Sequence, residues 1–366
     1  MDSEKTGAHP LKRKRAGGCA VKKLLCTAVL LLVTVPAWAK DFRIGVLYWS
    51  MNIPGQVAMR QGLEAQAEQI NKYALSHDAP TVTLETRVAG DGEAGIEKQI
   101  RQMNELIGER VDMLIVQPTD NAALSNPLRA ANKAGIPVVA YDQYISDGVL
   151  AAYRSSDNYQ AGYLDGEYIA ALFPGDKAIR LVLVEYPHVS STVERVNGFL
   201  DALQQLQKRY KVLKTYSAVE PAGGRKAASE ILLDFPERGS IDAIFTVNDG
   251  GGLAVVEGLH AAGRREILMA TVDGDPASVE NIRAKRLTVI DAAQFCGPLG
   301  AEAMRTAYAL LNGEKPPYYA LVPVFPITSK TMAVYPGWLG PIPSSFTKPW
   351  PSKSPVWLDK LNIVRP

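Results

Sequence analysis

Residues 241–263 read IDAIFTVNDGGGLAVVEGLHAAG and contain the three parts that recur along the rest of the chain. An apolar run at residues 243–247 ends at Asn248 and Asp249, three glycines follow, and apolar residues then recur at helical spacing. The pattern predicts a strand, a polar turn and a helix. Asn248 and Asp249 therefore lie at the carboxyl end of a strand, which is the edge where open α/β sheets bind ligands. The glycines leave a bare backbone that either admits a bulkier ligand or loosens the turn.

Strand and helix patterns alternate on both sides of this stretch. Apolar or alternating segments predict strands at residues 44–47, 81–88, 113–116, 137–140, 179–184, 212–216, 243–247, 267–272 and 287–292. Helical patterns separate the strands, and one of them begins at Thr119-Asp120 and ends before Gly135. Parallel strands need connections of this length. The sequence therefore predicts an α/β protein with two doubly wound, Rossmann-like parallel-sheet lobes, the second of which starts after Asp157.

The first 39 residues have a different pattern. Basic residues precede an apolar stretch at residues 24–35, and Ala37-Trp38-Ala39 forms an A-x-A cleavage motif before Lys40. This order predicts an export signal that is cleaved after Ala39. A retained anchor is a weaker alternative, because the stretch has about half the residues that span a bilayer. A lipoprotein is weaker still, because both cysteines of this region precede or open the apolar run.

Charge and composition exclude several classes of function. The whole chain of 366 residues carries +2, the first 39 residues carry seven Lys or Arg and two Asp or Glu, and the remainder is therefore −3. A nucleic-acid-binding protein needs a clustered basic face, which the sequence after residue 40 lacks. Cys296 is the one cysteine after the predicted cleavage site, so no internal disulfide can form.

Motifs for catalysis and for metal or cofactor binding are absent from the sequence. The four histidines form no cluster with metal-ligand spacing, and the chain has no phosphate-binding loop, dinucleotide fingerprint or nucleophile elbow. We therefore expect no metal site, no cofactor and no catalytic residue, and an enzyme is disfavoured.

Polar and aromatic residues follow almost every predicted strand. These segments are residues 48–52, 117–120, 141–143, 185–188, 248–249, 273–275 and 294–295. Carboxylates and carboxamides suit a neutral polyhydroxylated ligand, and an aromatic face packs on the apolar side of a sugar ring. Taken alone, each of Asp120, Asp142, Asn248 and Asp273 is more simply explained as a helix cap. The joint pattern favours a common binding site.

Six motifs resemble a known family. They are QPTD at residues 117–120, AGIPVVAYD at 134–142, SSDN at 155–158, ERVNGF at 194–199, IFTVND at 244–249 and VDGDP at 272–276. Their order and spacing resemble the periplasmic sugar-binding proteins of the ribose-binding type, which are type I periplasmic binding proteins and share their fold with the effector domain of lac-repressor-like regulators. The resemblance covers roughly residues 41–324. No DNA-binding head precedes it, which disfavours a regulator.

The resemblance implies a set of ligand contacts. The family's ligand-binding positions match Asp142, Arg195, Asn248, Asp273 and Gln294. Close relatives of the ribose binder carry Arg where Gln143 stands, and they carry aromatics after the first strand where this chain has residues 52–56. Trp49, Tyr48 or Tyr144 could replace these aromatics. The predicted ligand-binding set is Trp49, Gln56, Asp142, Gln143, Arg195, Asn248, Asp273 and Gln294.

The resemblance also implies how the lobes are assembled. Residues 40–156 with 295–323 form the first lobe, residues 157–294 with 324–332 form the second, and three segments between them form a hinge. Residues 333–366 are a Pro- and Trp-rich extension. We expect this extension to be extended chain anchored by Trp338, Trp350 and Trp357, either packed onto its own lobe or used to dock a partner.

The expected function is that of a monomeric periplasmic receptor that closes on a small, carbohydrate-like ligand and delivers it to the membrane permease of an ABC importer. The alternative is a sensing subunit that passes the ligand signal to a membrane histidine kinase. The extension and the altered pocket keep this alternative open. An exported carbohydrate-active enzyme is the least favoured function.

Overall fold

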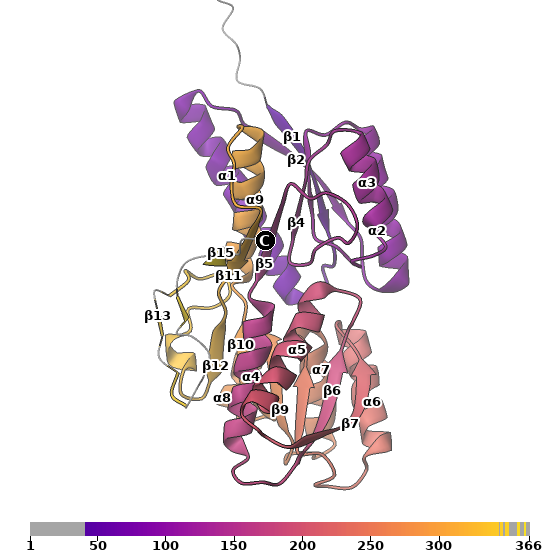
Figure 1. Ribbon diagram of the computed structural model, residues 1–366, viewed down its shortest axis with the longest axis vertical. Helices are drawn as coiled ribbons and strands as arrows, with labels where there is room; N and C mark the ends of the chain where they lie inside the picture. Colours follow the sequence, from indigo (N-terminus) through magenta and orange to yellow (C-terminus); the bar gives the residue numbers. More distant parts are fainter. Residues whose placement is uncertain (1–40, 344, 347, 351–356, 359–361, 364–366) are drawn as a thin grey trace, which may run out of the picture. The chain divides into compact units, whose positions relative to one another are not determined.

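The computed structural model describes residues 41–343, 345–346, 348–350, 357–358 and 362–363. The predicted export signal lies outside these residues. The described chain contains two α/β lobes, each built on one mainly parallel sheet (Figure 1). This confirms the predicted fold class. No helix in the described residues is both long and apolar enough to cross a membrane.

Lobe 1 contains a seven-stranded sheet in the order β15-β11-β5-β4-β3-β1-β2. Its strands are β1 (Phe42–Tyr48), β2 (Val82–Val88), β3 (Met113–Val116), β4 (Val138–Tyr141), β5 (Ala152–Ser156), β11 (Tyr319–Val322) and β15 (Asn362–Ile363). All neighbours run parallel except β15, which pairs antiparallel with β11. Two helices pack on each face: α1 (Pro54–His77) and α9 (Cys296–Leu311) on one, α2 (Gly92–Gly108) and α3 (Ser125–Lys133) on the other.

Lobe 2 contains a six-stranded sheet in the order β12-β10-β9-β8-β6-β7. Its strands are β6 (Ile179–Glu185), β7 (Tyr210–Ser217), β8 (Ala243–Thr246), β9 (Leu268–Asp273), β10 (Thr288–Ala293) and β12 (Phe325–Thr328). Only the β10–β12 pair is antiparallel in this sheet. Its helices are α4 (Asn158–Leu172), α5 (Ser190–Gln205), α6 (Pro221–Asp234), α7 (Asp249–Ala261) and α8 (Pro276–Arg283). The α4–α5 pair covers one face of the sheet and the α6–α7 pair the other.

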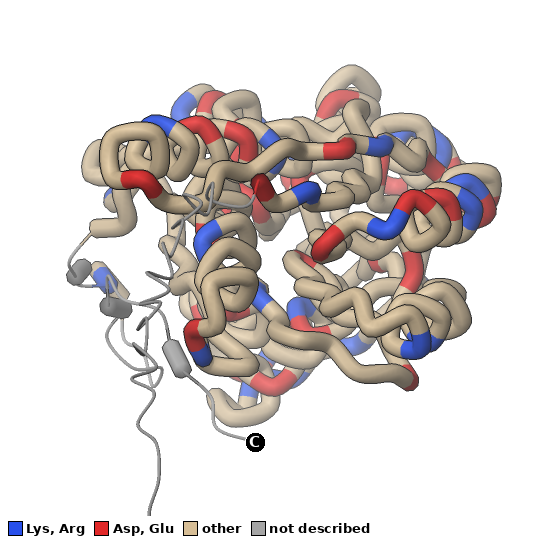
Figure 2. Tube along the Cα trace, turned by 90° about the horizontal axis from the view of Figure 1, so that it is seen from above, with Lys and Arg blue, Asp and Glu red and all other residues tan. Residues whose placement is uncertain are grey.

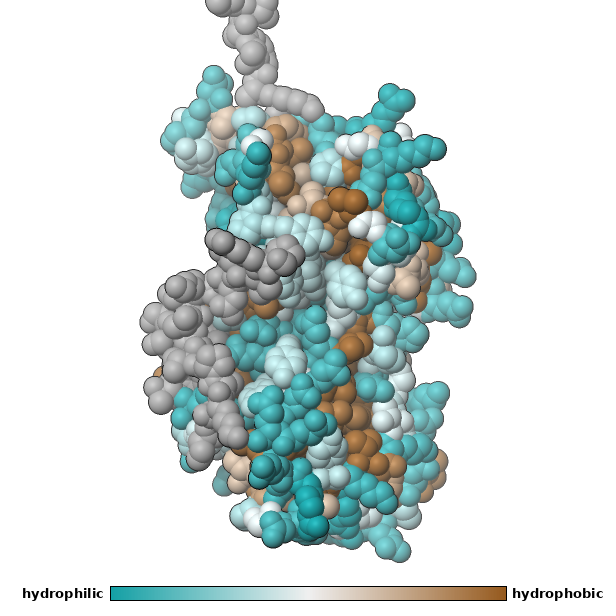
Figure 3. Space-filling model, viewed as in Figure 1, coloured by the Kyte–Doolittle hydropathy of each residue, from teal (hydrophilic) through white to brown (hydrophobic). Residues whose placement is uncertain are grey.

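The chain passes between the two lobes three times. It leaves the sheet of lobe 1 after β5 and enters lobe 2 with α4, returns between β10 and α9, and crosses again between β11 and β12. Lys and Arg positions are interspersed with Asp and Glu positions over the chain (Figure 2). The face in Figure 3 is mostly hydrophilic, with apolar residues in patches over both lobes.

Glycines allow the paired helices of each lobe to approach closely. A Cβ on Gly162 of α4 would lie 1.8 Å from the carbonyl oxygen of Arg195 in α5, and one on Gly300 of α9 would lie 1.9 Å from the carbonyl oxygen of Met59 in α1. A real Cβ does not fit at such distances, so each helix pair is in direct backbone contact. In lobe 2 this contact lies at Arg195 itself.

Strand β5 and helix α4 are among the elements that were absent from the sequence prediction. Strand β5 reads AYRSS and lacks an apolar run, yet Arg154 at its centre is 1% exposed. Its guanidinium donates to Thr306 Oγ1 and to the Pro317 carbonyl, and lies 3.5 Å from Glu302. The partners of Arg154 come from distant segments, so the local pattern could not indicate burial.

The start of α3 was predicted too early. The helix begins at Ser125, whereas the sequence pattern placed its start at Thr119-Asp120. The Asp120 carboxylate accepts hydrogen bonds from the backbone N–H groups of Ala122 and Ala123, at 2.8 and 2.7 Å. These bonds close a separate turn ahead of the helix. Asp120 therefore caps a turn, as its residue type suggested.

Candidate functional site

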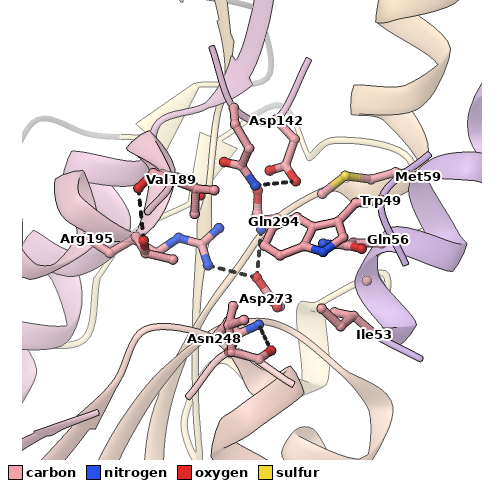
Figure 4. A pocket seen from close by; sticks show the side chains of 15 residues that line it. Trp49, Ile53, Gln56, Met59, Asp142, Val189, Arg195, Asn248, Asp273 and Gln294 are labelled. Carbon is pink, nitrogen blue, oxygen red and sulfur yellow. Dashed lines mark hydrogen bonds and ion pairs between the residues drawn. The ribbon is translucent and has the colours of Figure 1, made fainter. Parts of the chain in front are cut away.

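A pocket lies between the lobes at the carboxyl ends of both sheets (Figure 4). The space between the lining atoms, with the open mouth of the pocket included, is about 340 Å³. The lining residues are Trp49, Ile53, Gly55, Gln56, Met59, Asp142 and Gln143 from lobe 1, and Val189, Ser191, Thr192, Arg195, Val219, Asn248, Asp273 and Gln294 from lobe 2. All eight residues predicted as ligand contacts are in this set. They converge because parallel strands place their carboxyl ends along one edge of each sheet.

Arg195 and Asp273 form a buried ion pair at the centre of the pocket. Arg195 Nη1 lies 3.1 Å from Asp273 Oδ1, and the two side chains are 3% and 7% exposed. The same guanidinium donates to Asn158 Oδ1 at 2.9 Å and to the Val247 carbonyl at 2.7 Å. Gln294 Nε2 donates to Asp273 Oδ1 at 2.7 Å. These bonds hold the guanidinium and the carboxylate in place without a ligand.

Asp142 is a second buried carboxylate, and it comes from lobe 1. Its Oδ2 accepts hydrogen bonds from Gln117 Nε2 at 3.0 Å and Gln143 Nε2 at 2.9 Å. Burial raises the pKa of Asp142 to about 6, and the nearby positive charge of Arg195 opposes that rise. At neutral pH Asp142 is therefore mostly ionised and accepts hydrogen bonds.

Two amide side chains of the pocket turn their N–H groups towards the carboxylates. Gln143 donates to Asp142 and Gln294 donates to Asp273. The Oε1 atoms of both glutamines are buried and have no hydrogen-bond partner among the described residues. Such unpaired buried acceptors are costly unless a ligand donates to them. The central part of the pocket thus presents acceptor oxygens and one guanidinium.

Asn248 and Asp273 occupy different positions at their strand ends. Asn248 Oδ1 accepts from Gly251 N at the start of α7, so the residue is a helix cap as well as a pocket residue. Asp273 has φ 134°, a strained value for a residue with a side chain. The strain indicates that the fold fixes the direction of this carboxylate.

One wall of the pocket is apolar. Trp49, Val189 and Val219 form a buried cluster, and the Tyr186 ring packs on Trp49 with centroids 6.2 Å apart. Ile53 and Met59 extend the lining. The sequence analysis missed Ile53, Met59, Val189 and Val219, because it compared only polar and aromatic residues at the strand ends. These residues lie shortly after β6 and β7 and at the start of α1. Those positions were the signal from which their place in the pocket could have been predicted.

The sequence analysis suggested three aromatic residues as replacements for the aromatics that close relatives carry after the first strand. Of these three, only Trp49 lines the pocket. The Tyr48 hydroxyl donates to Glu64 and its ring is buried in the core of lobe 1. Tyr144 is 40% exposed, and its ring packs edge-on against Tyr153. The suggestion was therefore wrong for Tyr48 and Tyr144.

The two lobes touch at the rim of the pocket. Asn121 N donates to the His188 carbonyl at 3.1 Å, and Tyr144 N donates to Ser190 Oγ at 3.2 Å. The His188 ring lies 3.5 Å from the Asp120 carboxylate. Each contact joins a loop of lobe 1 to lobe 2. These contacts would break if the lobes separated.

Three further carboxyl groups, Asp165, Asp249 and Asp291, are buried in lobe 2 behind Asp273. Asp249 accepts from Asp275 N at 2.8 Å, and Asp291 accepts from Gly274 N at 2.9 Å, so the two groups hold the turn that follows Asp273. Both oxygens of Asp165 lack a hydrogen-bond partner among the described residues. Burial and mutual repulsion raise the pKa of all three.

The three glycines after Asp249 are needed for close packing. A Cβ on Gly250 would lie 2.5 Å from the Val219 carbonyl, and one on Gly252 would lie 2.5 Å from Thr246 Oγ1. They form the first turn of α7. The sequence analysis suggested that these glycines admit a bulkier ligand or loosen the turn. Close packing explains them instead.

Cys296 lies behind the pocket at the start of α9. It is fully buried, burial raises the pKa of its thiol, and a Cβ on Gly55 would lie 3.5 Å from its sulfur. In the part of the chain that the structure describes, no group of three or more His, Cys, Asp or Glu side chains could hold a metal ion.

Comparison with known proteins adds independent information. The model of the periplasmic binding protein domain matches residues 44–315. The ribose import binding protein RbsB of Bacillus subtilis (strain 168) is 29% identical over 311 residues, which cover 81% of this chain and 94% of that protein. A galactofuranose binding protein has a TM-score of 0.71 at 17% identity, covering 80% of this chain and 97% of its own.

A second solved structure is the fructose-binding periplasmic domain of a hybrid two-component system. It has a TM-score of 0.69 at 23% identity and covers 80% of this chain and 93% of its own. At these identities the two solved structures establish the likeness of fold alone.

Proposed function

Because the chain belongs to the periplasmic binding protein domain family, we propose that it binds a small sugar or sugar-like solute in the periplasm and delivers it to the permease of an ABC importer. It is a solute-binding protein and not an enzyme. The observation that carries the proposal is the convergence of Asp142 from lobe 1 with Arg195 and Asp273 from lobe 2 on one pocket.

The chemistry of the pocket selects a ligand that is rich in hydrogen-bond donors. Asp142 and Asp273 supply carboxylate oxygens, and Gln143 and Gln294 present carbonyl oxygens that have no hydrogen-bond partner within the described chain. Vicinal hydroxyl groups donate to such acceptors, whereas a sugar acid or sugar phosphate would bring negative charge to a site with two carboxylates and one guanidinium. The ligand is therefore a neutral polyol or monosaccharide, with an apolar side that packs on Trp49.

Ligand binding closes the lobes on each other. The pocket residues come from both lobes, so a solute held between them favours the closed arrangement by its greater affinity for that arrangement. The permease recognises the closed pair of lobes. Export to the periplasm uses the predicted signal, and the exported protein begins at Lys40.

A sensing role is the second candidate. The likeness to the fructose-binding periplasmic domain of a hybrid two-component system supports it, because that domain has the same fold in a signalling protein. Neighbouring permease and ATPase genes favour import, and a neighbouring sensor-kinase gene favours sensing.

The binding proposal is tested by thermal unfolding of residues 40–366 with a panel of monosaccharides, polyols, sugar acids and sugar phosphates. A neutral sugar or polyol raises the midpoint, since binding to the folded state alone stabilises it. Asp142→Ala and Asp273→Ala each abolish the shift. If no neutral compound raises the midpoint, or if both variants respond like the wild type, the proposal is wrong.

A further inference from the structure

The chain after β12 is outside the family match, which ends at residue 315, and it contacts residues directly behind the pocket. The Tyr335 hydroxyl donates to the Gly274 carbonyl at 3.2 Å. Its ring packs against Phe295 and Phe325, with centroids 6.3 and 5.6 Å apart. Gly274 follows Asp273 and Phe295 follows Gln294. One side chain thus contacts the residues that directly follow two pocket residues.

The next contact of this segment is with lobe 1. The Trp338 carbonyl accepts a hydrogen bond from Gly297 N at 3.0 Å, in the first turn of α9. A Cβ on Gly297 would lie 3.1 Å from the Leu339 side chain, so the two segments are in close contact. Trp338 also packs against the core of lobe 1.

The segment then contacts lobe 2 and returns to lobe 1. Lys348 Nζ lies 3.5 Å from Glu167 Oε2 of α4, with both side chains buried, and the Trp350 ring packs edge-on against Tyr168, with centroids 5.0 Å apart. Strand β15 pairs antiparallel with β11 at the edge of the lobe 1 sheet. In Figure 1 this yellow segment lies beside β12 and α9.

We propose that the described residues 332–343, 345–346, 348–350, 357–358 and 362–363, here called the C-terminal strap, are a positioning element of the ligand site that braces the two lobes across the hinge. The inference deepens the proposed function and rests on it. The described attachments of the strap alternate between lobe 2 and lobe 1, at Gly274, Gly297, Glu167 and β11. The expectation that the extension packs on its own lobe is therefore wrong for its described residues.

The brace raises ligand affinity by holding the pocket in its binding arrangement. Separation of the lobes moves the attachment points on lobe 2 away from those on lobe 1, which strains or breaks the contacts of the strap. The strap therefore increases the fraction of unliganded protein that is already competent to bind, and apparent affinity scales with this fraction. Tyr335 also helps to hold the turn that follows Asp273. Its hydroxyl donates to the Gly274 carbonyl, and Gly274 N donates to Asp291.

The first test is Tyr335→Phe, which removes the hydroxyl and keeps the ring. We expect the dissociation constant of the panel sugar with the largest thermal shift to rise about 3- to 10-fold, the effect of one net hydrogen bond. The matched control is Tyr308→Phe, which removes a hydroxyl that donates to the Pro80 carbonyl at 2.8 Å within lobe 1. This control leaves the dissociation constant unchanged while lowering the unfolding midpoint.

The second test needs no ligand. Removal of residues 344–366 deletes the later attachments to α4 and β11 and keeps Tyr335 and Trp338. Small-angle X-ray scattering of the unliganded truncated protein should give a larger radius of gyration than that of the wild type, with unchanged helix content by circular dichroism. Lys348→Met, which breaks the Glu167 pair in the full chain, should shift the radius in the same direction.

The proposed brace is wrong if two results are found together. The radius of gyration is then equal for the wild type, the truncated protein and Lys348→Met, and the dissociation constant is equal for the wild type and Tyr335→Phe. If no panel sugar binds even the wild type, the proposed function fails, and the scattering comparison alone decides on the brace. If the truncated protein keeps the wild-type radius of gyration but no longer binds a membrane partner, the strap is a docking segment instead of a brace.

Discussion

Arg195 Nη1 and Asp273 Oδ1 lie 3.1 Å apart, and this ion pair is buried although its residues are 78 positions apart in the chain. A buried pair contributes little net stability over apolar residues, but the loss of one partner leaves the other charge uncompensated. The pair therefore makes lobe 2 sensitive to single substitutions at either residue.

The Arg195→Met substitution should lower the free energy of unfolding by about 3–5 kcal/mol, because Asp273 then remains buried without its partner. Urea unfolding measures the change. The double variant Arg195→Met/Asp273→Asn should recover a large part of the loss. Arg43→Met is the control: its ion pair with Glu85 is partly exposed, at 44% and 33%, and its loss should cost less than about 1 kcal/mol. Equal losses for Arg195→Met and Arg43→Met would contradict the prediction.

Ligand affinity should depend on pH through Asp142. The pKa of Asp142 is about 6, and the ionised carboxylate is the form that accepts hydrogen bonds from ligand hydroxyls. The dissociation constant for a neutral sugar should be constant above about pH 7 and rise towards tenfold per unit below the pKa. Calorimetric titration at several pH values measures this. The Asp142→Asn variant binds more weakly and should have a flat profile, and a wild-type constant that is equal at pH 5 and pH 8 would refute the role of Asp142.

Protein stability should fall as pH rises, because of the buried carboxyl cluster. In the folded protein the pKa of Asp165 is raised well above its ordinary value by burial. Between the unfolded pKa and the raised folded pKa, the folded state therefore holds a proton that the unfolded state has lost, and the free energy of unfolding decreases by up to about 1.4 kcal/mol per pH unit per such proton. The Asp165→Asn variant should show a smaller decrease in urea unfolding across this range.

The control for the Asp165 experiment is Asp78→Asn, at the exposed end of α1. This variant should follow the wild-type dependence on pH. The assignment fails if the curves of Asp165→Asn and the wild type are parallel.

Close helix packing should make Gly162 intolerant of even a methyl group. In Gly162→Ala the new Cβ meets the Arg195 carbonyl, so α4 and α5 must separate, at a cost of about 1–3 kcal/mol. The shift of α5 also displaces Arg195, and the thermal response to the sugar should decrease. Gly108→Ala is the matched control, since a Cβ there meets nothing within 4 Å; it should stabilise α2 by about 0.4–1 kcal/mol. Similar effects of the two substitutions would rule out the packing argument.

The sequence predicted the features that depend on local pattern. Alternating strands and helices gave the α/β fold, and six ordered motifs gave the family, which the match to residues 44–315 confirms. Asp142, Asn248 and Asp273 were found because polar residues after parallel strands meet at one edge. Whether these residues contact a ligand stays a prediction.

Features that depend on tertiary partners could not be predicted. Burial of Arg154 in β5 depends on Thr306 and Glu302, which lie far away in the chain. The direction of each glutamine amide in the pocket depends on the neighbouring carboxylate. The path of the strap depends on single contacts such as that of Tyr335 with Gly274, for which proline and tryptophan content gave no signal.

The burial of Cys296 has a practical consequence. It is the one cysteine within the described chain. As the first residue of α9 it is fully buried. Thiol-reactive dyes should therefore not label the native protein. A single cysteine introduced on the exposed surface near the pocket rim could carry a fluorophore without prior removal of Cys296, and the receptor would then become an optical reporter for its own solute.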